Sequence, residues 1–302
     1  MREVTDAGTT ARDIVTAWAA PATRRRPRAT MRRRVRRGTN QAVATSVSLV
    51  MIIPIYLVVV NSLKTDADAR AMGPGLPREL RFDNYNVVID EGKLSQAFVN
   101  SMMYTVFATV LCVVCATAAA FVLARNRTRF NRWLYLFLVI GIAMPVNYVT
   151  LTKVMQTTHL VNTQLGMVIL YAALKLPFSV FVIYAFVHTV PIEIDEAAII
   201  DGCSPSQLFW RIMVPLLRPA WITVGILTFL DLWSEFIMPL YFLSSSDKWP
   251  MTLAVYNFFG IYESSWNLVS ADVVLTILPV LVVFVFGQRY IKSGVTAGAV
   301  KG

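Results

Sequence analysis

The sequence contains few charged residues for its length. Of its 302 residues, 15% are Asp, Glu, Lys or Arg, whereas 56% are hydrophobic. Soluble domains carry about 25% charged residues, so this deficit argues against an ordinary soluble fold. Several stretches of about 20 residues are almost free of charge, which is the length of a helix that crosses a hydrocarbon core of about 30 Å. We therefore predict an all-α membrane protein.

Cysteine and histidine are scarce as well. Three cysteines and two histidines are too few for a disulfide framework, and we expect no metal site. Cys112 and Cys115 form a C-x-x-C pair, but they lie in the apolar run 105–122 with no histidine nearby, so we interpret them as small residues of a membrane helix. The sequence also contains no G-x-x-x-x-G-K-[ST] phosphate-binding loop. We therefore expect no bound cofactor and no ATP hydrolysis by this chain.

Six apolar stretches are candidate membrane helices. They cover residues 42–63, 98–123, 132–153, 165–188, 219–244 and 272–291. The third and fourth contain Pro145 and Pro177, which membrane helices tolerate when neighbouring groups satisfy the freed backbone. Residues 1–40 are polar and rich in arginine, and we predict a disordered tail there, followed by a transmembrane domain over residues 41–302.

The net charge of +10 comes mainly from this tail, which holds nine arginines between Arg24 and Arg37. An arginine cluster directly before an apolar stretch is typical of a positive-inside anchor beside anionic membrane lipid, and we expect no nucleic-acid binding. The connection after the second stretch and the C-terminal tail are also basic, whereas residues 154–164 contain neither Lys nor Arg. We therefore predict that both termini are cytoplasmic.

The segment between the fourth and fifth stretches, residues 190–219, is too long for a hairpin. Glu193, Asp195 and Glu196 would lie in the first turn of a short helix, where the helix dipole favours acids. Gly202 fits the position after such a helix that requires a positive φ. Small and apolar residues beside acids suit insertion into a groove of another protein, and an amphipathic helix pair at the membrane surface is the alternative.

A second short helix should follow in the same segment. Ser204 can cap its N-terminus, with Pro205 at the first position and Gln207 completing a capping box. We expect Pro215 and Pro219 to end this helix before the fifth stretch.

This segment resembles the EAA loop of the permease subunits of binding-protein-dependent ABC importers. The resemblance is carried by Glu196, Ala197, Ala198, Asp201, Gly202, Ile212 and Pro215. Cys203 stands where the family usually has Ala. Residues 233–236 and the C-terminus are similar to the maltose-type carbohydrate permeases, and the likeness covers roughly residues 42–302.

The resemblance implies the fold of a type I ABC importer permease, with six transmembrane helices and a cytoplasmic coupling helix between helices 4 and 5. Glu196 would be the charged contact with a cytoplasmic ATPase subunit, Ala197 and Ala198 would allow close approach, and Gly202 would make the bend. The remaining coupling residues would be Asp201, Cys203, Ile212 and Pro215. In the C-terminal tail, Thr296, Ala297, Gly298 and Lys301 would reach the ATPase dimer.

The family also implies partners and a location. They are a second permease subunit, an ATPase dimer that binds ATP and Mg, an extracytoplasmic solute-binding protein, and membrane lipid. The chain would lie in a bacterial inner membrane and carry a sugar, either an oligosaccharide or an amino sugar.

Three ionisable residues lie within the predicted spans, where such residues are rare and need a partner. They are Lys175 in the fourth span and Asp231 and Glu235 in the fifth. Asp231 and Glu235 are four residues apart and share a helix face. We predict that Lys175 pairs with Glu235 or with Asp231, either to hold two helices in register or to line and gate the sugar path.

Two other functional classes remain open. An ion-coupled secondary transporter would use Asp231 and Glu235 as proton sites, but it would need no loop for docking an ATPase. A membrane-embedded enzyme would need a metal or nucleophile cluster within the spans, and His159 and His188 lie near opposite membrane faces.

Overall fold

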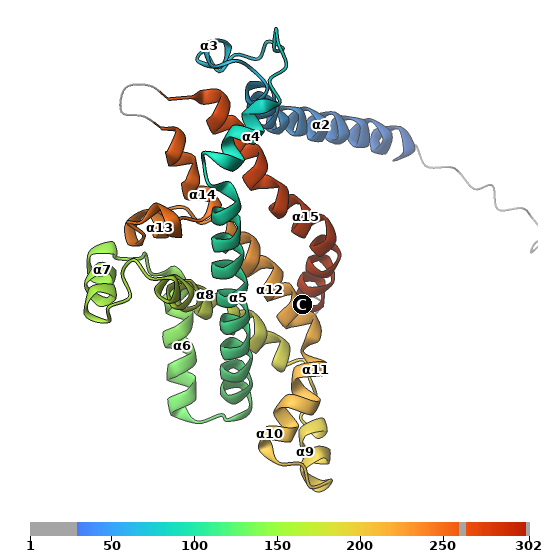
Figure 1. Cartoon of the computed structure of the whole chain (residues 1–302). Coiled ribbons are helices and arrows are strands. Elements are labelled where there is room, and N and C mark those ends of the chain that lie inside the picture. The colour runs from blue at the N-terminus through green and yellow to red at the C-terminus, as the bar shows by residue number, and fades with distance from the viewer. Residues whose placement is uncertain (1–28, 260–263, 300–302) are drawn as a thin grey trace, which may run out of the picture. The chain divides into compact units, whose positions relative to one another are not determined.

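The computed structural model in Figure 1 describes residues 29–259 and 264–299, with side chains described over 39–259 and 264–290. The chain divides into two compact units, residues 1–54 and residues 55–302. Over the described ranges the secondary structure is helical, apart from one isolated β-bridge between Phe259 and Ser264. The predicted all-α class is therefore confirmed.

The first unit contains most of helix α2, Ala29–Ser62, in which Pro54 marks the division between the units. The predicted boundary of the tail at residue 40 is too late, because residues 29–40 belong to this helix. Arginine, methionine and alanine are good helix formers, and several of them precede the apolar part of α2. Residues 1–28 of the predicted tail lie outside the described residues.

The second unit is built from four long helices and several short ones. The long helices are α5 (Leu94–Arg125), α8 (Gln164–Val187), α12 (Arg218–Trp233) and α15 (Trp266–Ala299). The shorter elements are α3 (Asp66–Ala69), α4 (Asp83–Asp90), α6 (Arg129–Ala143), α7 (Tyr148–Thr157), α9 (Glu193–Ile200), α10 (Pro205–Gln207), the π-helix η1 (Leu208–Met213), α11 (Val214–Leu216), α13 (Ile237–Phe242), η2 (Ser246–Lys248), α14 (Met251–Ala254) and η3 (Val255–Phe258).

Four of the described helices are long and apolar enough to cross a membrane by themselves. They are Thr39–Ser62, Leu94–Arg125, Gln164–Val187 and Trp266–Tyr290. Two further spans are possible as bent pairs: α6 with α7, which meet at 117°, and the segment Pro205–Leu216 with α12, which meet at 72°. The described residues therefore contain four helices that could each cross a membrane, or up to six spans if each bent pair counts as one.

The third and fifth predicted spans are wrong as continuous helices. Helix α6 ends at Ala143, because Pro145 forces Met144 into an extended conformation with φ −76° and ψ 124°. Helix α12 ends at Trp233, and α13 starts at Ile237. Pro239 has no N–H to bond the carbonyl of Glu235, and this carbonyl instead accepts a hydrogen bond from the hydroxyl of Thr252 at 2.9 Å.

Helices α5 and α8 pack side by side at the centre of the second unit (Figure 1). The buried face of α5 carries a small residue at every fourth position, namely Ala108, Cys112, Ala116, Ala120 and Ala124. Small side chains let two membrane helices approach closely. Cys112 is 1% exposed and donates a hydrogen bond to the hydroxyl of Ser179 on α8 at 3.2 Å, whereas Cys115 is exposed.

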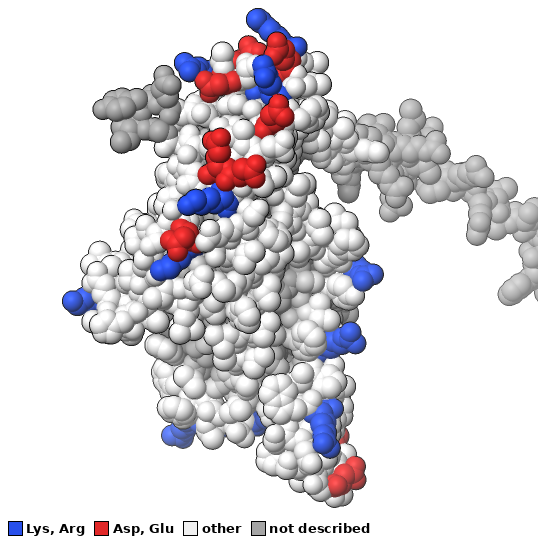
Figure 2. Space-filling model, viewed as in Figure 1, with Lys and Arg blue, Asp and Glu red and all other residues white. Residues whose placement is uncertain are grey.

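Hydrophobic clusters fill this unit along its length. At the end that carries α9 and α10, residues of α5, α8 and α12 pack with Ala198, Leu208 and Met213. Near the opposite end, Trp233 of α12 and Ala271 of α15 pack with residues of α4 and α14. On the face shown in Figure 2, charged side chains are frequent in the upper half and at the lower end, and the surface between them is uncharged apart from basic side chains at its edges.

The α3–α4 end is held by a buried amide. Asn84 donates hydrogen bonds to the carbonyls of Ser62 at 2.8 Å and Lys64 at 2.9 Å, and its own oxygen accepts one from Asn267 at 3.0 Å. One side chain thus joins three segments that are far apart in the sequence.

Candidate functional site

The segment between α8 and α12, residues 190–217, folds as the two short helices that its pattern predicts, and we refer to it as the two-helix loop. Gly202 follows α9 with φ +82°, which confirms the expected left-handed position. Ser204 accepts a hydrogen bond from the backbone N–H of Gln207 at 3.3 Å, and the side chain of Gln207 accepts one from the backbone N–H of Ser204 at 2.8 Å. The predicted capping box is therefore confirmed.

The end of the loop differs from the prediction. Pro215 lies inside α11 rather than ending the second helix, and Pro219 lies in the first turn of α12. The chain bends by 72° between Leu216 and Arg218. Before this bend, residues Leu208–Met213 form a π-helix, a rare geometry that often occurs at functional sites.

The outer face of the loop is apolar and acidic. Ile199 is 62% exposed and Ile200 is 85% exposed, and the side chains of Glu196 and Ala197 are exposed beside them. Ala198 is buried within its own chain at 5% exposure, so its small size serves internal packing. Of the other predicted coupling residues, Asp201, Gly202 and Pro215 are exposed, and Cys203 and Ile212 are half-buried.

An ion pair that the sequence analysis missed attaches the loop to α5. Nε of Arg125, in the last turn of α5, lies 2.6 Å from Oδ2 of Asp195 in α9, and the two side chains are 15% and 9% exposed. Nη2 of Arg125 donates to Oδ1 of Asp195 at 3.4 Å and to the carbonyl of Val190 at 3.1 Å. The Nε contact does not have hydrogen-bond geometry, so it is an electrostatic contact, and the hydrogen bonds come from Nη2.

His188 follows the last residue of α8 and stacks edge-on against Tyr184, with ring centroids 4.6 Å apart. Burial, together with the nearby Arg127 and Arg125, lowers the pKa of His188 below its usual value of 6.5. Burial and, to a lesser extent, the basic end of α5 therefore disfavour the protonated form of this histidine.

A cavity of about 600 Å³ lies where the two broken helices meet α8. Its lining includes Met144 and Val146 at the break between α6 and α7, Lys175 on α8, Asp231 on α12, and Glu235 at the break before α13. The walls are partly polar, and Tyr148 and Phe178 contribute aromatic surface.

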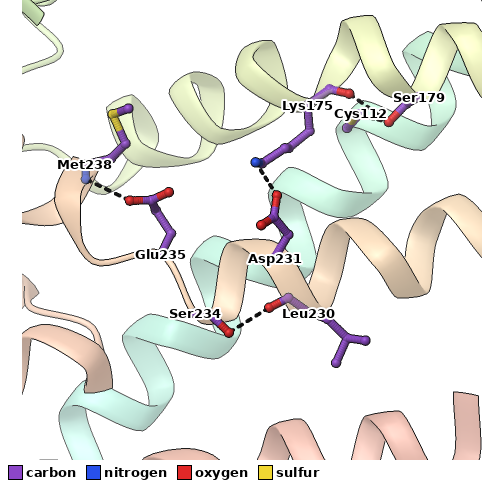
Figure 3. A network of polar contacts seen from close by, with 8 residues as sticks. All are labelled: Cys112, Lys175, Ser179, Leu230, Asp231, Ser234, Glu235 and Met238. Atoms are coloured by element: carbon purple, nitrogen blue, oxygen red, sulfur yellow. Dashed lines mark hydrogen bonds and ion pairs between the residues drawn. The ribbon is translucent and has the colours of Figure 1, made fainter. Parts of the chain in front are cut away.

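The three predicted intramembrane charges meet at this cavity, as Figure 3 shows. Lys175 pairs with Asp231. Of the two predicted pairings, with Glu235 or with Asp231, the structure therefore contains the one with Asp231. Glu235 lies apart from Lys175 and turns toward α13, where its Oε1 accepts hydrogen bonds from the backbone N–H groups of Ile237 at 2.8 Å and Met238 at 3.2 Å. Thr228, another residue of the lining, is 3% exposed, and its hydroxyl has no hydrogen-bond partner among the described residues.

The predicted C-terminal contact is only partly described. Thr296, Ala297 and Gly298 lie in the last turns of α15, but their side chains are outside the described residues, and so is Lys301 altogether.

Residues 113–296 match the family model of the binding-protein-dependent transport system inner membrane component. This match covers the two-helix loop, the residues that line the cavity, and α15 as far as residue 296. The chain belongs to this family. It is a multi-pass membrane permease, and the family works with a solute-binding protein.

Curated relatives span almost the whole membrane domain. The chain is 31% identical over 256 residues to the probable starch degradation products transport system permease protein of Thermoanaerobacterium thermosulfurigenes, covering 84% of this chain and 93% of the relative. It is 32% identical over 255 residues to a diacetylchitobiose uptake system permease protein of Streptomyces coelicolor, covering 83% and 84%. These relatives are transporter permeases, which argues against the secondary transporter and the enzyme as alternatives.

A solved structure confirms the fold. The chain superposes on a chain of a bacterial ABC transporter involved in the import of the acidic polysaccharide alginate with a TM-score of 0.75 at 21% identity, covering 85% of this chain and 96% of that chain. The predicted importer permease fold is thus confirmed.

Proposed function

We propose that the chain is a permease subunit of an ATP-driven carbohydrate importer in a bacterial inner membrane. It forms the translocation path with a second permease subunit, receives sugar from an extracytoplasmic solute-binding protein, and docks a cytoplasmic ATPase dimer through the two-helix loop. The names of the relatives, which refer to starch degradation products and diacetylchitobiose, support a sugar as substrate.

The cavity at the broken helices carries this proposal. Membrane transporters place substrate sites where spanning helices are interrupted, because irregular backbone is tolerated only along a cavity or inside protein. Both interruptions, at residues 144–147 and 234–236, open onto the same cavity of about 600 Å³. This volume lies in the range of small-molecule sites and accommodates a disaccharide.

The two-helix loop supports the ATPase contact. Ile199 and Ile200 are exposed on a short ordered helix, and such a helix buries its apolar residues by entering a groove of a partner. Glu196 adds a charge on the exposed side of the same helix. The chain has no phosphate-binding loop of its own, so ATP and Mg would be held by the partner ATPase.

This assignment places both termini in the cytoplasm, on the same side of the membrane as the loop. We propose that the tail residues Thr296, Ala297, Gly298 and Lys301 contact the ATPase dimer.

Co-purification tests the docking role. The chain is expressed together with its partner permease, ATPase and solute-binding protein, and the membrane complex is purified through a tag on this chain. Glu196→Lys should lower the amount of ATPase recovered at least tenfold, because it reverses a charge at a small protein contact. Glu91→Lys, which makes the same charge change at an exposed residue outside the loop, should recover normal amounts. Equal recovery from both variants would exclude the loop as the docking element.

Uptake of labelled sugar tests the path. Lys175→Asp and Asp231→Lys should each abolish uptake, because each turns the ion pair of residues 175 and 231 into two like charges. The double variant restores one charge of each sign and should recover part of the uptake. A double variant as inactive as either single variant, with the complex intact, would refute a role for the pair.

A further inference from the structure

We infer that this cavity selects sugars by charge, accepting neutral and amino sugars and excluding sugars that carry a carboxylate or a sulfonate. The inference rests on the proposed function and adds the substrate class. It comes from the way in which Lys175, Asp231 and Glu235 use their polar groups (Figure 3).

The charges of the lining do not balance. The cavity is lined by one basic residue, Lys175, and by two acidic residues, Asp231 and Glu235. Their sum at neutral pH is +1 − 2 = −1. Lys175 is already paired with Asp231, and its side chain is 25% exposed against 62% for Asp231. The carboxylate is therefore the more exposed partner of this ion pair.

Glu235 supplies the uncompensated charge. Its Oε1 is held by the backbone N–H groups of Ile237 and Met238, which fixes the position of the carboxylate. Its Oε2 accepts no hydrogen bond from any residue that the structure describes. A fixed carboxylate with one free oxygen suits a sugar hydroxyl or an ammonium group as donor, and it repels a substrate carboxylate.

Thr228 also contributes to the lining, three residues before Asp231 on α12. The residue is 3% exposed, and its hydroxyl has no hydrogen-bond partner among the described residues. A buried hydroxyl without a partner is costly. Because this oxygen is almost inaccessible, the side chain must turn before a sugar hydroxyl can bond it. Tyr148 adds an aromatic ring on which a sugar can pack.

The repulsion should be large enough to measure. Charges in partly buried sites interact far more strongly than in water, so removing the charge of Glu235 should change the affinity for a charged sugar by about tenfold, while a neutral sugar should change by less than about twofold.

Three disaccharides of similar size and different charge test the inference: cellobiose, which is neutral, the glucosamine disaccharide, which is cationic, and digalacturonate, which is anionic. Binding to the purified complex in lipid nanodiscs is measured by saturation-transfer NMR, without the solute-binding protein, so that only the permease discriminates. For the wild-type complex, cellobiose and the glucosamine disaccharide should bind at least tenfold more tightly than digalacturonate.

Glu235→Gln keeps the shape and a carbonyl oxygen to accept from α13, and it removes the charge. This variant should strengthen digalacturonate binding about tenfold, weaken binding of the glucosamine disaccharide by a similar factor, and leave cellobiose nearly unchanged. Glu79→Gln, on the exposed segment before α4, makes the same charge change far from the cavity and should alter none of the three.

The outcomes separate the inference about charge from the proposed sugar path. If the three probes bind the wild type equally, or if Glu235→Gln changes all three by the same factor, the charge inference is wrong and the sugar path stands. If no probe gives a signal that Lys175→Asp removes, the cavity is not a sugar site, and the sugar path proposed at this cavity fails with it.

Discussion

Removing Arg125 should detach the two-helix loop from α5. The pair of Arg125 with Asp195 is almost completely buried, at 15% and 9% exposure, and Arg125 also satisfies the carbonyl of Val190. Removing one partner of a buried ion pair costs about 3–5 kcal/mol, because the other charge is left without compensation. We take the lower limit of this cost, about 3 kcal/mol, because both side chains keep some contact with solvent.

This cost predicts a measurable opening of α9. Each 1.36 kcal/mol is a factor of ten in an equilibrium constant, so a loss of about 3 kcal/mol should raise the opening equilibrium roughly 100-fold. Hydrogen exchange of the α9 amides in the assembled transporter measures this directly. For Arg125→Met, exchange should accelerate by about two orders of magnitude. Asp195→Asn should have a smaller effect, because its neutral side chain can still accept a hydrogen bond from Arg125.

A double-mutant cycle separates the ion pair from general damage. Arg125→Met combined with Asp195→Leu should be milder than the sum of the single variants, because no charge is left buried. The exposed pair of Arg81 and Glu79, whose side chains are 51% and 67% exposed, is the control, and its coupling energy should stay below about 1 kcal/mol. If the buried pair couples no more strongly than this control, or if Arg125→Met changes the exchange of α9 less than fivefold, the pair does not hold the loop.

Three further changes test local features. Gly166→Ala places a Cβ 2.1 Å from the carbonyl oxygen of Leu160. It should destabilise the start of α8 by about 1–3 kcal/mol, which a lower melting temperature of the complex would show. Gly75→Ala is the control and should not change the melting temperature, because a Cβ there has no atom within 4 Å. Asn84→Leu removes the three hydrogen bonds that join the ends of α2, α4 and α15 and should speed amide exchange at that end without changing recovery of the ATPase. The lowered pKa of His188 means that the folded state resists protonation of this side chain. The contribution of neutral His188 to stability should therefore be fully present above the ordinary histidine pKa of about 6.5 and fall as the pH drops below that value. His188→Gln should remove this pH dependence of stability, and an unchanged pH profile in the variant would contradict the assignment.

The features that the sequence predicted correctly are local. The positive φ of Gly202 and the capping box of Ser204 and Gln207 depend on side chains within three residues of the backbone groups that they serve. Each could be read from spacing alone, because the partners are neighbours in the chain. The same holds for the acids in the first turn of α9.

The features that the sequence analysis missed depend on contacts between distant segments. The pattern of residues 219–244 predicts one apolar span, because nothing local shows that the carbonyl of Glu235 is satisfied by Thr252. Arg125 read as one of several basic residues in a connection, because its partner lies 70 residues away. The choice of Asp231 over Glu235 as the partner of Lys175 was also open, since two acids on one helix face are equivalent until the break at residues 234–236 turns one of them away.

Asp195 and Glu196 are neighbours in sequence, yet they lie on different sides of α9. Asp195 is buried against Arg125 of α5, and Glu196 is exposed. A partner that binds the exposed side of α9 therefore pushes on a helix whose other side is attached to α5. Helix α5 packs along α8, which carries Lys175. This contiguous set of rigid elements forms a physical route from the loop to the cavity.

The contact between α5 and α8 is the step of this route that can be changed without touching either end. Cys112→Ile adds volume where α5 meets Ser179 of α8 at 1% exposure, and overpacking a tight contact forces the helices apart at a cost of about 1–3 kcal/mol. ATPase recovery should be normal, whereas sugar uptake per ATP hydrolysed should fall severalfold. Cys115→Ile makes the same substitution on the exposed face of α5 and should leave this ratio unchanged. If Cys112→Ile leaves the ratio of sugar uptake to ATP hydrolysis unchanged in a complex of normal stability, movement of the loop reaches the cavity by another route. The bend between Leu216 and Arg218, which joins the loop directly to α12, is that alternative route.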